Sequence, residues 1–121
     1  MSYPVLSVAL GGALGASLRF VVAGLMAREG FPVAILVVNV LGSFVMGLVA
    51  VSLLRAGLPQ WQPFLMTGVL GGFTTFSAFS LETMTLIERG AFGSAGLYVV
   101  LSVGLSVAAL MLGVTLARSL P

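Results

Sequence analysis

Apolar residues occupy four long blocks of the chain, at residues 5–26, 32–54, 63–87 and 92–117. A helix needs about 20 mainly apolar residues to cross the hydrocarbon core of a bilayer, and each block reaches that length. Short polar connectors with glycine or proline separate the blocks, as expected between helices. The pattern predicts an all-α membrane protein with four transmembrane helices in a single domain, residues 1–121.

Small residues recur at four-residue spacing within these blocks. The pairs are Gly11/Gly15, Ser43/Gly47 and Gly68/Gly72. Such pairs let the backbones of neighbouring membrane helices approach closely. Close packing is therefore the simplest interpretation of each pair.

The third block is the least regular, because glycines and hydroxyl residues gather at residues 71–80. Gly71 and Gly72 are adjacent, and adjacent glycines destabilise a helix. A break there would free carbonyl oxygens that only protein, water or a bound cation could satisfy. Carbonyls and hydroxyls without carboxylates suit an alkali cation better than a divalent one. We predict a break in the third helix at this stretch; a kinked helix that serves packing alone is the alternative.

Two other spans carry polar side chains at helical spacing. Asn39 and Ser43 lie one turn apart in the second span, and Tyr98, Ser102 and Ser106 follow at four-residue steps in the fourth. Polar groups in a bilayer cost free energy unless they find partners, so each is a candidate site. An interhelical hydrogen bond would explain Asn39, and bonding to the backbone would explain isolated serines. Three aligned hydroxyls favour a track that passes an anion along by donating hydrogen bonds.

Phenylalanines alternate with hydroxyl residues in the third span. Phe73, Phe76 and Phe79 recur every three residues, with Thr75 and Ser77 between them. Lipid or core contact is the usual meaning of such spacing. The alternation argues against a purely apolar face, and aromatic ring edges carry a partial positive charge that can meet an anion. These rings and hydroxyls are therefore candidate pore-lining groups.

Composition narrows the chemistry. Apolar residues make up 60% of the chain and charged residues 7%, with no Lys, Asp, His or Cys. Without imidazole, thiol or aspartate, we expect no enzyme and no zinc, haem or iron–sulfur site. A net charge of +2, scattered along the chain, does not favour nucleic-acid binding. Arg19, near the end of the first span, either anchors that end at the interface or lines a vestibule where its charge concentrates anions.

The arginines outside the spans divide equally between the two sides of the membrane. Arg55 and Arg118 belong to one side, and Arg28 and Arg89 to the other. Because the arginine bias sets orientation, this balance predicts insertion both ways. An antiparallel, dual-topology homodimer could then form. A fixed topology set by other features is the alternative.

Three motifs together resemble the Fluc/CrcB fluoride-channel family. They are Gly-Ala-Leu-Gly-Ala-Ser-Leu-Arg at 12–19, Val-Asn-Val-Leu-Gly-Ser-Phe-Val-Met-Gly at 38–47, and Gly-Gly-Phe-Thr-Thr-Phe-Ser-Ala-Phe-Ser at 71–80. Their order and spacing, followed by a fourth apolar span, extend the resemblance over essentially the whole chain. Ala78 departs from the family pattern, since a hydroxyl residue is common at its position.

The resemblance implies a multi-pass channel of the cell (inner) membrane that lets fluoride leave the cytoplasm passively and so lowers its toxicity. It implies a dual-topology homodimer with two antiparallel pores. The matching pore positions are Asn39, Phe76, Phe79, Tyr98, Ser102 and Ser106. It also implies a structural sodium ion (Na+) at the dimer centre, held by backbone carbonyls matching Gly71 and Thr74, and it matches Arg19 to the arginine that closes the first motif.

Two other functions compete with a fluoride channel. A small multidrug-type, proton-coupled exporter also has four spans, but it needs a titratable carboxylate within the membrane. The first two spans carry none, and Glu82 and Glu88 lie at the end of the third. A non-transporting assembly subunit is the second alternative, and it would show no ion flux.

Overall fold

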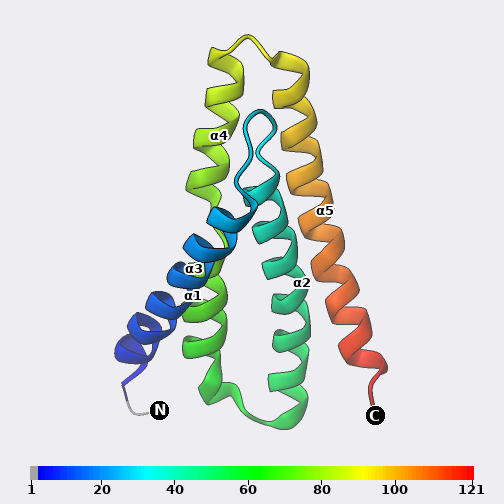
Figure 1. The fold of residues 1–121 in the computed structure, drawn as a ribbon. Coiled ribbons are helices and arrows are strands. Elements are labelled where there is room, and N and C mark those ends of the chain that lie inside the picture. Colours follow the sequence, from blue (N-terminus) through cyan, green and yellow to red (C-terminus); the bar gives the residue numbers. More distant parts are fainter. Residues whose placement is uncertain (1–2) are drawn as a thin grey trace.

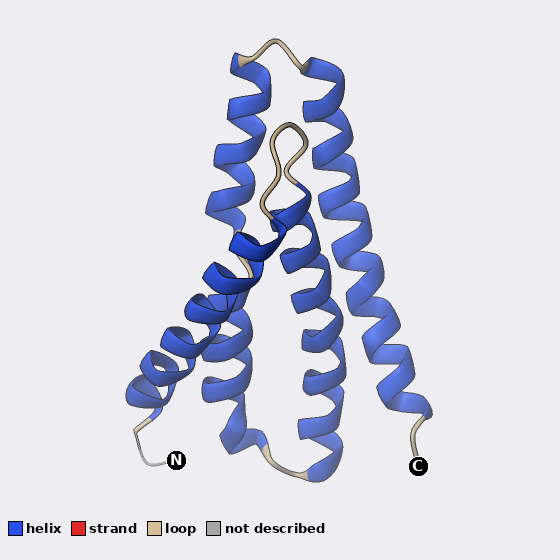
Figure 2. Cartoon of the chain, viewed as in Figure 1, coloured by secondary structure: helices blue, strands red, loops and turns tan. Residues whose placement is uncertain are grey.

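The computed structural model describes residues 3–121, and all regular structure in that range is helical (Figure 2). Helix α1 spans Pro4–Met26, α2 spans Val33–Ala56 and α5 spans Phe92–Ser119. Between α2 and α5 lie a 3₁₀ turn, η1 (Pro59–Trp61), a π-helix, η2 (Pro63–Leu70), a short helix, α3 (Gly71–Phe73), and helix α4 (Phe76–Glu88). The described residues thus form four segments long and apolar enough to cross a membrane, which confirms the predicted number.

The helices begin and end at residues that suit those positions. Proline stands in the first turn of α1 and of η2, where its missing N–H costs nothing. Gly57 ends α2 in the left-handed conformation, with φ of 69°, and its N–H points to the carbonyls of Leu53 and Leu54. Beside it, Arg55 donates from Nη1 to the Ala117 carbonyl at 2.8 Å, so the C-terminal ends of α2 and α5 are joined.

The helices pack as two close pairs. In Figure 1, α1 crosses the first half of the third span, and α2 runs beside α5. A Cβ added to Gly15 would collide with the Val69 carbonyl oxygen, and one added to Gly113 would collide with the Phe44 carbonyl oxygen. Because lipid gives helices no hydrophobic reason to associate, this backbone-to-backbone approach supplies the packing contacts.

The third span is broken, as predicted, but the break does not lie at its two glycines. Gly71 is helical, with φ of −63° and ψ of −35°. The backbone becomes extended at Thr74 (φ −86°, ψ 156°) and at Thr75 (φ −151°, ψ 117°). The glycine next to Gly71 is needed for packing instead, because a Cβ on Gly72 would lie 2.8 Å from the Gly12 carbonyl oxygen of α1. The close crossing of α1 therefore decides where glycine is required, and the β-branched threonines carry the extended backbone.

One face of α1 consists of apolar side chains that remain largely uncovered within residues 3–121. Six of them are more than half exposed: Leu6, Leu10, Leu14, Leu18, Val21 and Leu25. An exposed apolar face of this size is expected where a helix meets lipid or a second copy of the chain.

Candidate functional site

The break gives α4 a new N-terminus in the middle of the third span. Thr75 is the N-cap of α4, and its Oγ1 accepts a hydrogen bond from the Ala78 amide at 3.0 Å. Threonine is among the residues preferred at this position, because its hydroxyl satisfies an amide that has no helical partner. The same hydroxyl lies 3.2 Å from Ser77 Oγ. Thr75 thus has extended backbone within the break and also caps the helix that follows it.

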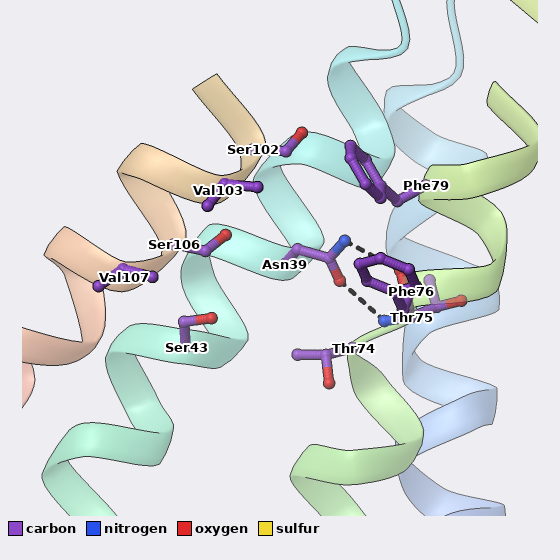
Figure 3. Close-up of a pocket in the computed structure, with 10 residues that line it drawn as sticks. All are labelled: Asn39, Ser43, Thr74, Thr75, Phe76, Phe79, Ser102, Val103, Ser106 and Val107. Carbon is purple, nitrogen blue, oxygen red and sulfur yellow. Dashed lines mark hydrogen bonds between the residues drawn. The ribbon is translucent and has the colours of Figure 1, made fainter. Parts of the chain in front are cut away.

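Asn39 of α2 holds the break through two hydrogen bonds to one residue (Figure 3). Its Oδ1 accepts from the Thr75 amide at 2.8 Å, and its Nδ2 donates to the Thr75 carbonyl at 3.0 Å. The side-chain amide therefore pairs with both backbone groups of Thr75, much as a neighbouring strand would. One of the two Nδ2 hydrogens remains for another acceptor.

Arg19 of α1 contacts the other end of the break. Its Nε donates to the Gly72 carbonyl at 3.1 Å, across 53 residues of sequence. In a continuous helix this carbonyl would accept from the amide four residues later, that of Phe76. A cationic donor near the C-terminal end of a helical segment also opposes the partial negative charge there.

The carbonyls of Gly71 and Thr74 lose their helical donors at the break. In a continuous helix they would accept from the amides of Thr75 and Ala78. Those amides donate to Asn39 Oδ1 and to Thr75 Oγ1 instead. Gly71 is exposed and Thr74 is half-buried. Carbonyls freed in this way, without carboxylates, fit the ligand preference of an alkali cation. The sodium site stays a prediction with which this chemistry agrees.

A cavity of about 250 Å³ lies between the break, α2 and α5 (Figure 3). Hydroxyl, amide and aromatic groups form much of its wall, and no carboxylate does. The lining residues are Asn39, Ser43, Thr74, Thr75, Phe76, Phe79, Ser102, Val103, Ser106 and Val107. Most of the predicted pore residues therefore meet around one space, although they come from three separate spans.

Three aligned hydroxyls of α5 are buried and bond to no other helix within residues 3–121; inside the row, Tyr98 and Ser102 interact with each other. They are the Tyr98 OH, Ser102 Oγ and Ser106 Oγ. Leaving a buried donor unsatisfied costs about 1–3 kcal/mol, so such groups need an explanation. Ser102 and Ser106 are among the residues that line the cavity, so a mobile acceptor there would lie beside both hydroxyls. The hydroxyls therefore make the cavity suited to an anion or to water.

Four aromatic rings in successive contact form a row that begins at the cavity, and we call this row the aromatic ladder. Ring centroids lie 5.3 Å apart for Phe76 and Phe79, 5.2 Å for Phe79 and Tyr98, and 5.5 Å for Tyr98 and Phe31. These spacings are typical of favourable aromatic pairs. Phe79 and Tyr98 are buried, whereas Phe76 is 76% exposed. Phe79 and Tyr98 are therefore packed within the protomer, whereas the ring of Phe76 is largely uncovered.

A second cavity, of about 540 Å³, opens among α1, the loop that follows it, α2 and α4. Its charged lining residues are Arg19, Arg28, Glu29, Glu82 and Arg89. Three arginines against two glutamates leave an excess of positive charge, which favours the presence of anions. The structure thus places Arg19 between this charged space and the break.

Some of the residues predicted for the site lie outside the first cavity. Ser77 is exposed at the start of α4, and Tyr98 lies beyond Phe79 in the ladder. Gly71 does not line the cavity either, although Thr74 does. Sequence reasoning missed Phe31, which reaches Tyr98 from the loop between α1 and α2. It placed Ser43 on the same face as Asn39 but did not name it among the pore residues.

Comparison with known proteins identifies relatives that span nearly the whole chain. The profile of the family described as "CrcB-like protein, Camphor Resistance (CrcB)" matches residues 6–114. The chain is 57% identical over 122 residues to the "Fluoride-specific ion channel FluC" of Ruegeria sp. (strain TM1040), covering 98% of this chain and 97% of the relative. It is 60% identical over 116 residues to the protein of the same name from Roseobacter denitrificans, covering 92% of each chain.

Proposed function

This chain belongs to the CrcB-like protein family, and on that basis we propose that it is a fluoride-selective channel through which fluoride leaves the cytoplasm passively. The observation that carries the proposal is a pair of buried hydroxyls, Ser102 Oγ and Ser106 Oγ, which bond to no other helix within residues 3–121 and belong to residues of the first cavity's wall. A small anion must exchange its hydration shell for hydrogen-bond donors, and these hydroxyls can donate to it.

The donor set favours conduction over tight binding. Besides the two serines, Asn39, Phe76 and Phe79 line the same space. Asn39 uses one Nδ2 hydrogen for the Thr75 carbonyl and keeps the other, and aromatic ring edges can meet an anion. No cationic side chain lines this cavity, so no single group would trap the anion. Conduction requires sites that are favourable enough to bind an ion and weak enough to release it.

The direction of transport follows from acid–base chemistry. Hydrogen fluoride is a weak acid that crosses bilayers as a neutral molecule and dissociates in the more alkaline cytoplasm. Fluoride then accumulates inside, and a passive channel lets it leave down its gradient. This role places the protein in the cell (inner) membrane, as a multi-pass protein.

A proton-coupled multidrug exporter is not favoured. Such a protein needs a titratable carboxylate where its substrate binds, and the first cavity has none in its wall. Glu82 lines the second cavity instead, in the middle of α4. The relatives named as fluoride-specific channels also argue against it. A non-transporting assembly subunit would leave these buried hydroxyls without a role.

We further propose an antiparallel, dual-topology homodimer with a structural Na+ at its centre. The equal division of arginines between the two sides supports dual topology. Phe76, 76% exposed although it belongs to the aromatic ladder, is suited to complete the pathway of a second copy. The carbonyls of Gly71 and Thr74 would hold the ion, and two carbonyls from one protomer need two more from another to form a cage. Bound there, sodium would supply the positively charged partner that the freed carbonyl oxygens need.

The function is tested by efflux of fluoride from liposomes that contain the purified protein. A fluoride electrode follows release, and chloride-loaded liposomes serve as the selectivity control. We expect fluoride release well above that of protein-free liposomes, with little chloride release. Equal release of both anions, or none of either, would refute the proposal.

Dual topology can be tested in cells, because the natural chain contains no cysteine. Single cysteines at Gln60 and at Glu29, in connectors on opposite sides, are labelled in spheroplasts with a membrane-impermeant maleimide. We expect about half of the molecules to react at each position, since copies insert both ways. Full labelling at one position and none at the other would establish a fixed topology.

A further inference from the structure

We propose that Arg19 and Asn39 are positioning residues that together hold the third span open, and that Arg19 does so through its Nε donor rather than through its charge. The inference rests on the proposed function, and it assigns these two side chains to the break itself. They come from different helices, α1 and α2, and they contact backbone on either side of Thr74. We call the two side chains and their contacts the clamp.

The clamp replaces the hydrogen bonds that a continuous helix would make at this point. A continuous helix would join the Gly71 carbonyl to the Thr75 amide, and the Gly72 carbonyl to the Phe76 amide. Asn39 Oδ1 takes the Thr75 amide at 2.8 Å, and Arg19 Nε takes the Gly72 carbonyl at 3.1 Å. Each side chain therefore bonds to one backbone group that a continuous helix would pair with another backbone group. The break then leaves neither of these two groups without a partner.

The clamp also fixes where the freed carbonyls lie. The Gly71 and Thr74 carbonyls are each one residue away from a clamped group, since Gly72 is held by Arg19 and Thr75 by Asn39. Backbone dihedrals next to a held peptide have little freedom. The clamp thus sets the spacing of the carbonyls that are proposed to hold sodium, and its loss would weaken sodium binding.

Arg19 has a competing role, because its guanidinium also lines the charged second cavity. Two substitutions separate the donor from the charge. Along the side chain, Nε2 of glutamine occupies the place of arginine Nε, so Arg19→Gln keeps a donor there and removes the charge. Lysine has a methylene at that place with its ammonium one bond beyond, so Arg19→Lys keeps the charge and moves the donor away from the position of Nε.

Backbone exchange measures the clamp without reference to transport. Hydrogen–deuterium exchange of the amides at residues 74–78 is followed by mass spectrometry in detergent, for the wild type, Arg19→Gln, Arg19→Lys and Asn39→Asp. Arg55→Gln is the matched control, because that arginine also donates to a carbonyl, at Ala117, but far from the break. Asn39→Asp keeps the acceptor for the Thr75 amide and removes the donor to the Thr75 carbonyl.

We expect exchange about tenfold faster in Arg19→Lys and Asn39→Asp, the usual consequence of losing one such hydrogen bond. Arg19→Gln and Arg55→Gln should exchange like the wild type. In liposomes, the sodium concentration for half-maximal fluoride flux, titrated against choline, should rise about tenfold in the same two variants only.

Three results would overturn the inference. Fast exchange in Arg19→Gln with normal exchange in Arg19→Lys would show that charge is what matters. Normal exchange in both would show that Arg19 does not hold the break, and fast exchange in both would show that its Nε donor is not what holds it. Hydrogen–deuterium exchange is measured without fluoride, so it tests the clamp separately from transport. The clamp could be disproved while fluoride conduction is confirmed, and conduction could be disproved while the clamp is confirmed.

Discussion

The third span meets its neighbours through two kinds of contact. Its first half lies against α1 along a glycine seam, which we define as Gly11, Gly15, Gly68 and Gly72, where backbone touches backbone and a Cβ would collide. Its centre, the break, meets α1 and α2 through polar side chains that bind backbone groups. The seam gains dispersion energy from close approach, whereas the break exchanges helical hydrogen bonds for side-chain ones. The difference indicates that the seam sets where the span lies and that the break sets which ions it can handle.

The largest effect is expected from a methyl group placed in the seam. Gly15→Ala puts a Cβ against the Val69 carbonyl oxygen, a backbone atom that cannot turn aside. We expect a loss of about 2–3 kcal/mol of stability, seen as a lower unfolding temperature and poor recovery of monodisperse protein. Gly12→Ala is the control, because a Cβ there meets nothing within 4 Å. Equal stability of the two variants would mean that the seam does not determine the packing.

The cavity serines should show the opposite pattern, with transport lost and stability kept. Removing both hydroxyls in Ser102→Ala/Ser106→Ala should lower fluoride flux by about tenfold or more, because two donors disappear from the pathway. The folded protein should be about as stable as the wild type, since neither buried hydroxyl bonds to another helix within residues 3–121. Thr115→Ala, which removes a hydroxyl bonded to Met111 on an exposed face, should change neither. Unaltered flux in the double variant would remove the serines from the pathway.

The two phenylalanines next to the break, both in α4, should separate an effect on transport from an effect on stability. Phe79→Ile should lower fluoride flux several-fold and cost about 1 kcal/mol of stability, because that ring is buried against Tyr98. Phe76→Ile should lower flux without a measurable loss of stability, because its ring is 76% exposed. Thermal unfolding and liposome efflux on the same preparations measure both quantities. Full flux in Phe76→Ile would place its ring outside the pathway.

The smallest effect is expected where a polar contact has no part in transport. Arg55→Gln removes the 2.8 Å hydrogen bond to the Ala117 carbonyl and should cost about 1 kcal/mol of stability with fluoride flux unchanged. Arg118→Gln removes an exposed arginine of the same side and is the control. A drop in flux for Arg55→Gln alone would show that polar contacts outside the break also reach the pathway.

What the sequence could predict depends on how local each feature is. The four spans follow from the lengths of the apolar blocks, and the alignment of Ser102 with Ser106 follows from one helical turn. The break was predicted for residues 71–80 and lies within them, at Thr74 and Thr75. The two glycines are helical instead, because contact with α1 decides where glycine is required.

An interhelical hydrogen bond was one expected explanation of Asn39, but the partners at the break could not be predicted, because they come from distant parts of the chain. Asn39 and Thr75 are 36 residues apart, and Arg19 and Gly72 are 53 apart. No periodicity along one helix specifies such a pair. The polarity of Asn39 and Arg19 marked them as candidate sites, but it could not tell whether they face an ion or a backbone. The π-helical form of Pro63–Leu70 likewise had no signal in the hydrophobic pattern.

The measurement that tests the central claim most directly is the reversal potential of the current across a planar bilayer containing the protein. With fluoride and chloride gradients opposed and a pH gradient imposed separately, a passive fluoride channel should reverse at the fluoride equilibrium potential. That potential shifts by about 59 mV for each tenfold change in fluoride and does not respond to pH. A reversal potential that follows chloride, or that moves with the proton gradient, would contradict a passive fluoride pathway lined by the break and the cavity serines.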